Sequence, residues 1–227
     1  MEFFAAIGNN LFYNLEDWRQ AISNWGGQHE MSSERLTKQM NFLAEIDKLK
    51  QIYRQNFITG GQRNETDAEH SWHMAMMAIL LGEYVKDRSV NILQVLKMVL
   101  IHDIVEIDAG DTYCFDERAG LDKAEREQRA AKRLFRLLPE DQAAEYNGLW
   151  EEFERQQTAE ACFAAALDRL QPLLLHQLTA GKAWKQHGIT SSKVYERNKR
   201  TREISTELGD LVQEMIESAI EKGYLAK

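Results

Sequence analysis

Apolar and polar positions alternate along most of this 227-residue chain with the three-to-four-residue period of amphipathic helices. Proline occurs only at Pro139 and Pro172, and no stretch alternates strictly with period two. The pattern therefore predicts an all-α fold. The expected helices cover residues 32–53, 67–82, 90–107, 123–137, a stretch opening at 139, 158–172, 174–184 and 191–223. The first has an apolar face of Leu36, Met40, Leu43, Ile46 and Leu49, and the helix opening at 139 has a buried stripe of Tyr146, Leu149, Trp150 and Phe153.

The length allows one well-buried core, so we expect a single domain over residues 1–227. Its motif-bearing part spans about residues 35–185, with the N-terminal and C-terminal helices packed outside it. A short helix that begins at residues 15–18 ends before Gly26. Further along the chain, Gly60 and Gly61 mark a loop from Arg54 to Thr66.

The stretch from Val99 to Asp111 places ionisable side chains inside a run of Leu, Ile and Val. Burial of such groups costs several kcal/mol unless they are paired or bind a metal. On a helix His102, Asp103 and Glu106 can converge on one small volume, and a divalent cation would compensate all three. Imidazole and carboxylate together suit Mn, Fe, Co, Ni or Zn. In the alternative, the two acids cap or pair locally and His102 is a core histidine.

A second acid stands in an apolar run at Asp168. Pro172 lacks an N–H group and crowds the carbonyl of Asp168, which predicts a kink that aims this carboxylate. The alternative is a surface pair between Asp168 and Arg169 or a neighbouring arginine. Upstream, His70 and His73 lie one turn apart on a largely apolar helix, and we expect His73 to be a packed or rim histidine.

The formal net charge of −8 argues against a general nucleic-acid-binding surface, so an anionic ligand must be met by local basic groups. Cys114 and Cys162 lie far apart, which indicates neither a zinc ribbon nor a disulfide framework and fits the cytoplasm. The first residues lack a basic region and no apolar stretch reaches membrane-spanning length. We therefore expect no signal peptide and no membrane span.

Four motifs occur in order along the chain: Arg63-Asn-Glu65, Glu69-His70-Ser71, the segment from His102-Asp103 through Glu106 to Gly110-Asp111, and Leu167-Asp168. Together they resemble the HD-domain metal-dependent phosphohydrolases, and within them the subgroup of 5′-deoxynucleotidases. The resemblance covers about residues 35–185. It implies a helical bundle with a metal site between central helices, and hydrolysis of deoxynucleoside 5′-monophosphates.

The resemblance also implies a role for each matching residue. The expected metal ligands are His70, His102, Asp103 and Asp168. Glu106 matches the acid that activates or positions the attacking water, and Asp111 matches a substrate-side or proton-transferring carboxylate. Arg54 matches a phosphate-contacting arginine, with Arg63 as the next candidate. The family usually has Arg followed closely by Trp, whereas this chain has Arg54-Gln-Asn-Phe57.

We expect one divalent ion, because His29, His176 and His187 are not spaced to complete a second site. Arg54 is expected at a helix-loop junction beside no acid partner. A homodimer is expected because the family resemblance implies it and because residues 174–184 hold more apolar side chains than one helix face needs.

Two alternatives remain at this point. The chain could be an HD hydrolase of another nucleotide or small phosphate ester, although we find no additional basic cluster for a longer anionic tail. It could also be a non-enzymatic interaction protein with a structural metal, but a structural site needs no acid such as Glu106 beside its ligands.

Overall fold

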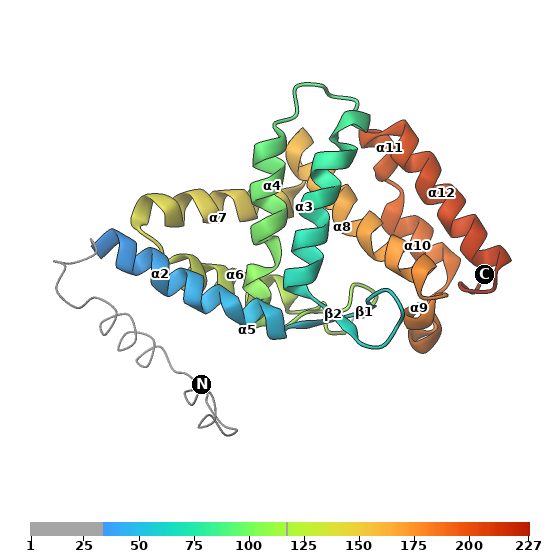
Figure 1. Ribbon diagram of the computed structural model, residues 1–227, viewed down its shortest axis with the longest axis horizontal. Helices are drawn as coiled ribbons and strands as arrows, with labels where there is room; N and C mark the ends of the chain where they lie inside the picture. Colours follow the sequence, from blue (N-terminus) through green and yellow to red (C-terminus); the bar gives the residue numbers. More distant parts are fainter. Residues whose placement is uncertain (1–33, 117) are drawn as a thin grey trace, which may run out of the picture.

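Three central helices pack against one another in every pairing and form the middle of the molecule (Figure 1). They are α3 (Asp67–Leu81), α4 (Ile92–Ile101) and α8 (Ala159–Leu178). Met74, Val95 and Leu167, one from each helix, are fully buried in the main hydrophobic cluster. The computed structural model describes residues 34–116 and 118–227, and in this part of the chain the all-α prediction is confirmed.

The N-terminus of α3 is fixed by a capping box. The Thr66 hydroxyl accepts a hydrogen bond from the Glu69 N–H, and the Glu69 carboxylate accepts one from the Thr66 N–H. Arg63 pairs with the same carboxylate. The helix ends in a 3-10 turn, η2 (Gly82–Tyr84). This start places His70 in the first turn of α3, at the end of the helix that faces the site.

The predicted helix over 90–107 is divided into three parts. After α4 the chain forms a 3-10 turn, η3 (His102–Val105), and then the short helix α5 (Glu106–Ala109). Gly110, with φ +75°, ends α5 in a conformation that glycine adopts at no steric cost. The His-Asp pair therefore begins a tight turn rather than lying in a regular helix, and Asp111 opens the following loop.

A second hydrophobic cluster lies on the side of η3 that faces away from the main hydrophobic cluster. It includes Phe42, Ile104, Leu134 and Trp150. Its helices are α2 (Glu34–Ile46), followed by the 3-10 turn η1 (Asp47–Gln51), then α6 (Lys123–Phe135) and α7 (Glu140–Arg155). α7 starts directly after Pro139 and buries Trp150 and Phe153, as predicted.

The predicted helix over 32–53 is wrong at its C-terminal end and in its buried face. α2 stops at Ile46, and Leu36, Met40 and Leu43, which we expected to be buried, are 37–53% exposed. The start of that prediction, and the short helix at 15–18, lie outside the described residues.

The predicted loop over 54–66 contains a two-stranded antiparallel hairpin. β1 (Tyr53–Phe57) pairs with β2 (Asn64–Thr66), with Tyr53 opposite Thr66 and Phe57 opposite Asn64. The strands are too short to show a period of two, so the pattern of the sequence could not indicate them. β1 carries Arg54, and β2 leads directly into α3.

α8 contains Pro172 and continues without a break to Leu178. The expected helix over 174–184 is therefore the end of α8 together with α9 (Lys182–His187). Gly181, with φ +68°, makes the turn between them, and a Cβ there would lie 2.1 Å from the Tyr224 carbonyl oxygen. Leu175 and Trp184 are buried within the fold.

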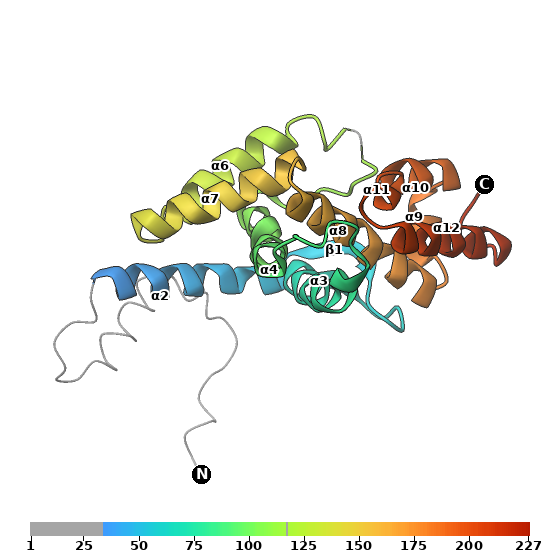
Figure 2. The same cartoon turned by 90° about the horizontal axis from the view of Figure 1, so that it is seen from above.

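The predicted helix over 191–223 is three helices. They are α10 (Ser191–Asn198), α11 (Thr201–Ile204) and α12 (Thr206–Glu221). Ser205 has an extended backbone, and its hydroxyl caps α12 by accepting from the Leu208 N–H. Val212 and Ile216 belong to the main hydrophobic cluster, so the expectation of an outer C-terminal helix is wrong. Figure 2 shows α9 to α12 grouped at one end, opposite α2, α6 and α7.

Candidate metal centre

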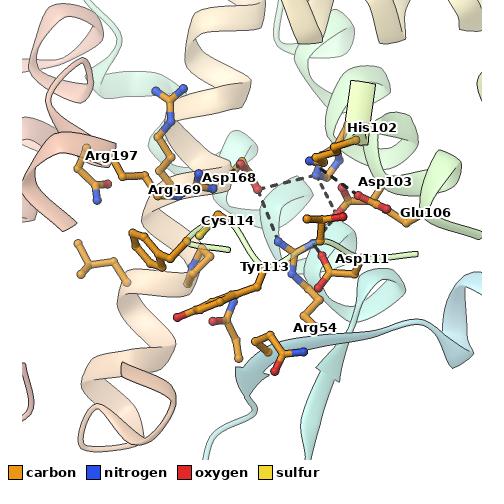
Figure 3. Close-up of a pocket in the computed structure, with 18 of the residues that line it drawn as sticks. Arg54, His102, Asp103, Glu106, Asp111, Tyr113, Cys114, Asp168, Arg169 and Arg197 are labelled. Carbon is orange, nitrogen blue, oxygen red and sulfur yellow. Dashed lines mark hydrogen bonds and ion pairs between the residues drawn. The ribbon is translucent and has the colours of Figure 1, made fainter. Parts of the chain in front are cut away.

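The site lies where the three central helices meet the hairpin. His70 comes from the first turn of α3. His102 and Asp103 come from the turn after α4 and Asp168 from the middle of α8, and Figure 3 shows these three side chains around one pocket. Ligand atoms of His70, His102 and Asp168 all lie within 4.8 Å of one another. These residues are 98 positions apart at the widest, so only the fold brings them together.

Hydrogen bonds fix the His70 ring so that Nε2 faces the cluster. Gln171 Nε2 donates to Glu65 Oε1 at 2.6 Å, which turns Gln171 Oε1 toward His70 Nδ1 at 2.9 Å. The amide oxygen only accepts, so the Nδ1 of His70 carries the proton. Nε2 of His70, 3.1 Å from Asp168 Oδ1, is left with its lone pair.

His102 is oriented in the same way by the backbone. Its Nδ1 donates to the Val99 carbonyl oxygen at 3.0 Å, which leaves Nε2 as the acceptor nitrogen. That atom is buried, has no hydrogen-bond partner among the described residues, and lies 3.1 Å from Asp103 Oδ2. A buried, unpaired acceptor nitrogen aimed at carboxylates is what a metal ligand requires before the ion binds. The residues present therefore fit a divalent cation.

One guanidinium stands among four carboxylates beside this cluster. Arg54 Nη1 lies 2.5 Å from Asp103 Oδ2 and 3.0 Å from Asp67 Oδ1. It is 4.0 Å from Asp111 Oδ1, and Nη2 is 3.9 Å from Asp168 Oδ1. The expectation that Arg54 has no acid partner is therefore wrong. A single positive charge does not balance four acids, which is a second reason why the site suits a cation.

The acids differ in how their surroundings affect ionisation. Burial raises the pKa of Asp103 and of Asp168, but charged neighbours outweigh it, including the Arg54 guanidinium for Asp103 and the Arg197 guanidinium for Asp168. Both carboxyls consequently have a pKa below the ordinary value and are ionised, the form that a metal needs. Burial and the charge of Asp103 raise the pKa of Asp67 to about 8.

Glu106 and Asp111 line the same pocket as Asp103 and Asp168. Burial and the Asp103 carboxylate raise the pKa of Glu106 to about 10, against the opposing charge of Lys123, whose Nζ lies 4.0 Å from Glu106 Oε1. Oε2 of Glu106 is buried without a hydrogen-bond partner among the described residues. Burial also raises the pKa of Asp111. Both acids are thus placed to exchange protons with a molecule in the pocket.

The structure does not bring Arg63 to this pocket. Its side chain is about half exposed and pairs with Glu69 on the outer side of the α3 N-terminus. Its assignment to substrate therefore stays a prediction that the geometry does not support. His73 is partly buried and contacts Gln171 at 3.1 Å, in keeping with a packed or rim histidine.

Sequence reasoning missed four residues of the site. Three are charged groups around the cluster and one is the amide that orients His70: Glu65, Asp67, Lys123 and Gln171. Gln171 is completely buried, one turn after Asp168 on the same helix. The signal that revealed Asp168, a polar side chain in an apolar run, was also present for Gln171.

The chain matches the model of the HD domain family over residues 46–208. It is 35% identical over 136 residues to human 5′-deoxynucleotidase HDDC2 and 34% identical over 145 residues to the Bos taurus protein of that name. These matches cover 60% and 63% of this chain. They cover 65% of the human relative, slightly less than two thirds of its length, and 69% of the bovine one.

A crystal structure described as a predicted metal-dependent phosphohydrolase from Magnetospirillum magnetotacticum has a TM-score of 0.82 and 55% identity. The match covers 85% of this chain and 96% of that one. An HD-domain phosphohydrolase from Listeria innocua shares the fold, with a TM-score of 0.58 and 19% identity. This match covers 80% of the present chain and 89% of the Listeria chain. The chain therefore belongs to the HD domain family. The predicted resemblance and the position of the cluster between central helices are confirmed.

Gln171→Met should weaken metal binding about 10- to 100-fold, because the His70 Nδ1–H group loses its acceptor and the ring loses its fixed orientation. The affinity is measured by competition with a chromophoric chelator. Gln177→Met is the matched control: Gln177 is on the same helix and donates to the Met215 carbonyl oxygen away from the site. Equal metal affinities in the two variants would contradict the orienting role of Gln171.

Proposed function

We propose that this chain is a metal-dependent phosphomonoesterase that hydrolyses deoxynucleoside 5′-monophosphates to nucleoside and phosphate. The observation that carries the proposal is the cluster of His70, His102 and Asp168, of which His102 and Asp168 line one pocket together with the Arg54 guanidinium. The names of the human and bovine relatives support the substrate class.

The proposed cofactor is one divalent transition-metal ion, Mn, Co, Fe, Ni or Zn, held by His70, His102, Asp103 and Asp168. Three of these ligands already converge, whereas Asp103 Oδ2 is held by Arg54 at 2.5 Å. Such an ion supplies a coordinated water with lowered pKa and polarises a phosphoryl oxygen. The ligand set is imidazole and carboxylate, which matches these metals.

Arg54 would bind the phosphoryl oxygens. Its side chain is only 11% exposed, and its buried Nε has no hydrogen-bond partner among the described residues. A planar guanidinium with an unused N–H can hold a phosphate through paired donors. The pairs with Asp67 and Asp103 keep the group at the pocket floor, so it need not be ordered when substrate binds.

Glu106 would position the attacking water or relay its proton, and Asp111 would transfer a proton on the substrate side. Both line the pocket, and the charge of the nearby Asp103 carboxylate contributes to the raised pKa of each. The organic part of the substrate would lie against Tyr113, Phe115 and Trp184, which line the same pocket. A structural metal site would need neither this pocket nor the two additional acids, which argues against the non-enzymatic alternative.

We also propose a homodimer, on a surface other than the one expected. Large exposed apolar side chains gather on α2, α3 and α4, which lie along one side of the molecule in Figure 2. They are Leu36, Met40, Leu43, Trp72, Met76, Ile79, Leu80, Leu93 and Leu100. By contrast, Leu175 and Trp184, from the segment we expected to pair, are buried. A second copy of the chain would remove this apolar face from water.

None of the helices in residues 34–116 and 118–227 is long and apolar enough to cross a membrane. Cys114 and Cys162 are both free thiols in the described structure. The free thiols support a reducing compartment, and we propose the cytoplasm as the location. Neither a membrane nor a nucleic acid is proposed as a partner.

Phosphate release should depend on the metal and be strongest with deoxynucleoside 5′-monophosphates. The measurement is phosphate released from a panel of deoxyribo- and ribonucleoside monophosphates, before chelation, after prolonged chelation and after adding back each candidate metal. Activity should fall to background on chelation and return with at least one metal. Full activity in excess chelator would exclude the proposed chemistry.

Glu106→Gln should retain the metal and bind nucleotide but turn over at least about a hundred-fold more slowly, because it keeps the side-chain size and loses the proton-transferring group. Metal analysis with single-turnover kinetics measures both effects. Glu151→Gln on α7, outside the pocket lining, is the matched control and should behave as the wild type. Near-wild-type turnover of Glu106→Gln would make Glu106 structural, and loss of the ion would make it a ligand.

Light scattering at micromolar concentration should give about twice the chain mass of 26.3 kDa. Leu80→Asp should shift the protein to the monomer mass, because it buries a charge in the proposed interface. Leu121→Asp is the control, since Leu121 is 88% exposed on the loop before α6 and away from that face. A monomeric wild type would remove the proposal.

A further inference from the structure

A group of basic side chains borders the pocket on the side of α8 and α10. Arg169 follows Asp168 on α8, and Arg197 comes from α10. Both line the pocket that contains the ligand cluster, and both also line a neighbouring hollow together with Lys193. In sequence these residues lie far apart, which is why no basic cluster could be found from spacing. The chain therefore does have a second concentration of positive charge, beyond Arg54.

Arg169 has no carboxylate partner among the described residues. Its Nη2 donates to the neutral side-chain oxygen of Gln156 at 2.6 Å. Arg197, the other cation that lines both cavities, lies beside Arg169. The Gln156 partner of Arg169 corrects the alternative in which Arg169 pairs with Asp168 at the surface. Two neighbouring guanidinium groups with too little negative charge between them favour an anion.

Asp168 divides its negative charge between this pair and the ligand cluster. Its Oδ1 lies 3.1 Å from His70 Nε2 and 3.9 Å from Arg54 Nη2, whereas Oδ2 lies 3.4 Å from Arg197 Nη2. One carboxylate is thus shared between the ligand cluster and Arg197. In Figure 3, Arg169 and Arg197 lie on the other side of Asp168 from Arg54 and His102.

The other acidic groups around the hollow do not neutralise Arg169 and Arg197. Glu196 is the one acid among the residues that line the hollow in the described structure, and it pairs with Lys199. Arg200, on the adjoining turn, pairs with Glu203 at 3.3 Å and lines neither cavity. The positive charge at Arg169 and Arg197 is therefore local and available to a ligand.

We propose that Arg169 and Arg197 form a second anion subsite, which holds a second phosphate carried by the organic part of the substrate. The inference builds on the proposed function, because it takes the first phosphate to be at Arg54 and the ligand cluster. Tyr113 and Phe115 line the same pocket as Arg54, Arg169 and Arg197, and a nucleoside can lie against their rings. A nucleoside 3′,5′-bisphosphate has this chemistry: two phosphates separated by a sugar.

The subsite also separates two kinds of polyanion. A 5′-triphosphate extends its extra charges directly from the reacting phosphorus, whereas a bisphosphate places its second charge across the sugar. Arg54 and Arg197 contact different oxygens of the Asp168 carboxylate and lie on opposite sides of it, which favours the second arrangement. Arginine suits this role because its planar fork binds phosphate oxygens in pairs.

The test compares release of the 5′-phosphate from 2′-deoxyadenosine 5′-monophosphate and 2′-deoxyadenosine 3′,5′-bisphosphate by the metal-loaded protein. Arg169→Gln should lower kcat/KM for the bisphosphate at least tenfold more than for the monophosphate. Arg200→Gln is the matched control, because it removes a nearby cation that lines neither cavity, and should leave the ratio of the two substrates unchanged. An unchanged ratio in Arg169→Gln would overturn the proposal. 2′-Deoxyadenosine 5′-triphosphate is assayed in parallel, and a loss of activity in Arg169→Gln that is confined to this substrate would also overturn the proposal.

A binding measurement keeps the subsite separate from the hydrolytic function. Calorimetry with 2′-deoxyadenosine 3′-monophosphate should show at least about tenfold weaker binding to Arg169→Gln than to the wild type, with the thermal unfolding of the variant compared to exclude misfolding. If no nucleotide is hydrolysed but this difference is found, the subsite stands and the phosphatase assignment fails. If hydrolysis occurs but neither the binding nor the substrate ratio depends on Arg169, the subsite is overturned and the phosphatase assignment stands.

Discussion

An excess of buried negative charge around Arg54 is the constraint on which this structure depends. Asp67, Asp103, Asp111 and Asp168 lie within 4.0 Å of one guanidinium, and their side chains are at most 20% exposed. Like charges so close together repel strongly when solvent screening is low. Arg54 offsets only part of the repulsion, and burial together with the charge of Asp103 raises the pKa of Asp67 to about 8, which favours its protonated form. A dication is the complementary charge that the cluster still lacks.

The same constraint explains why the elements meet where they do. Arg54 lies on β1, Asp67 begins α3, Asp103 follows α4, and Asp168 occupies the middle of α8. Each acid belongs to a different element, so the ion pairs tie the hairpin and the three central helices to one point between the two hydrophobic clusters. Two uncharged groups are as important as the ion pairs for the geometry of the site. Gln171 and the Val99 carbonyl oxygen each fix one imidazole so that its Nε2 faces inward.

Much of this could be predicted from the sequence, and the failures have physical causes. Polar residues in apolar runs indicated His102, Asp103, Glu106 and Asp168, because buried charge is costly wherever it occurs. The partners of Arg54 and the Arg169–Arg197 pair could not be predicted, since they come from tertiary contacts between distant segments. The break of the last helix at Ser205 has no glycine or proline to mark it, only a hydroxyl that caps α12. Periodicity placed an apolar stripe on α2 but could not say what covers it, and Leu36, Met40 and Leu43 face outward.

The pairing of β1 with β2 limits which insertions and deletions the chain can accept near its site. Strand residues rise about 3.3 Å each, so a slip of one residue in the pairing of Tyr53 with Thr66 would move the Arg54 guanidinium by more than its 3.0 Å distance to Asp67. Of the six residues between the strands, 58–63, those at the tip are less restricted, because Thr59, Gly60 and Gln62 are exposed. Insertions in this turn should therefore be accepted during evolution, whereas a single deletion within Tyr53–Phe57 should be removed by selection.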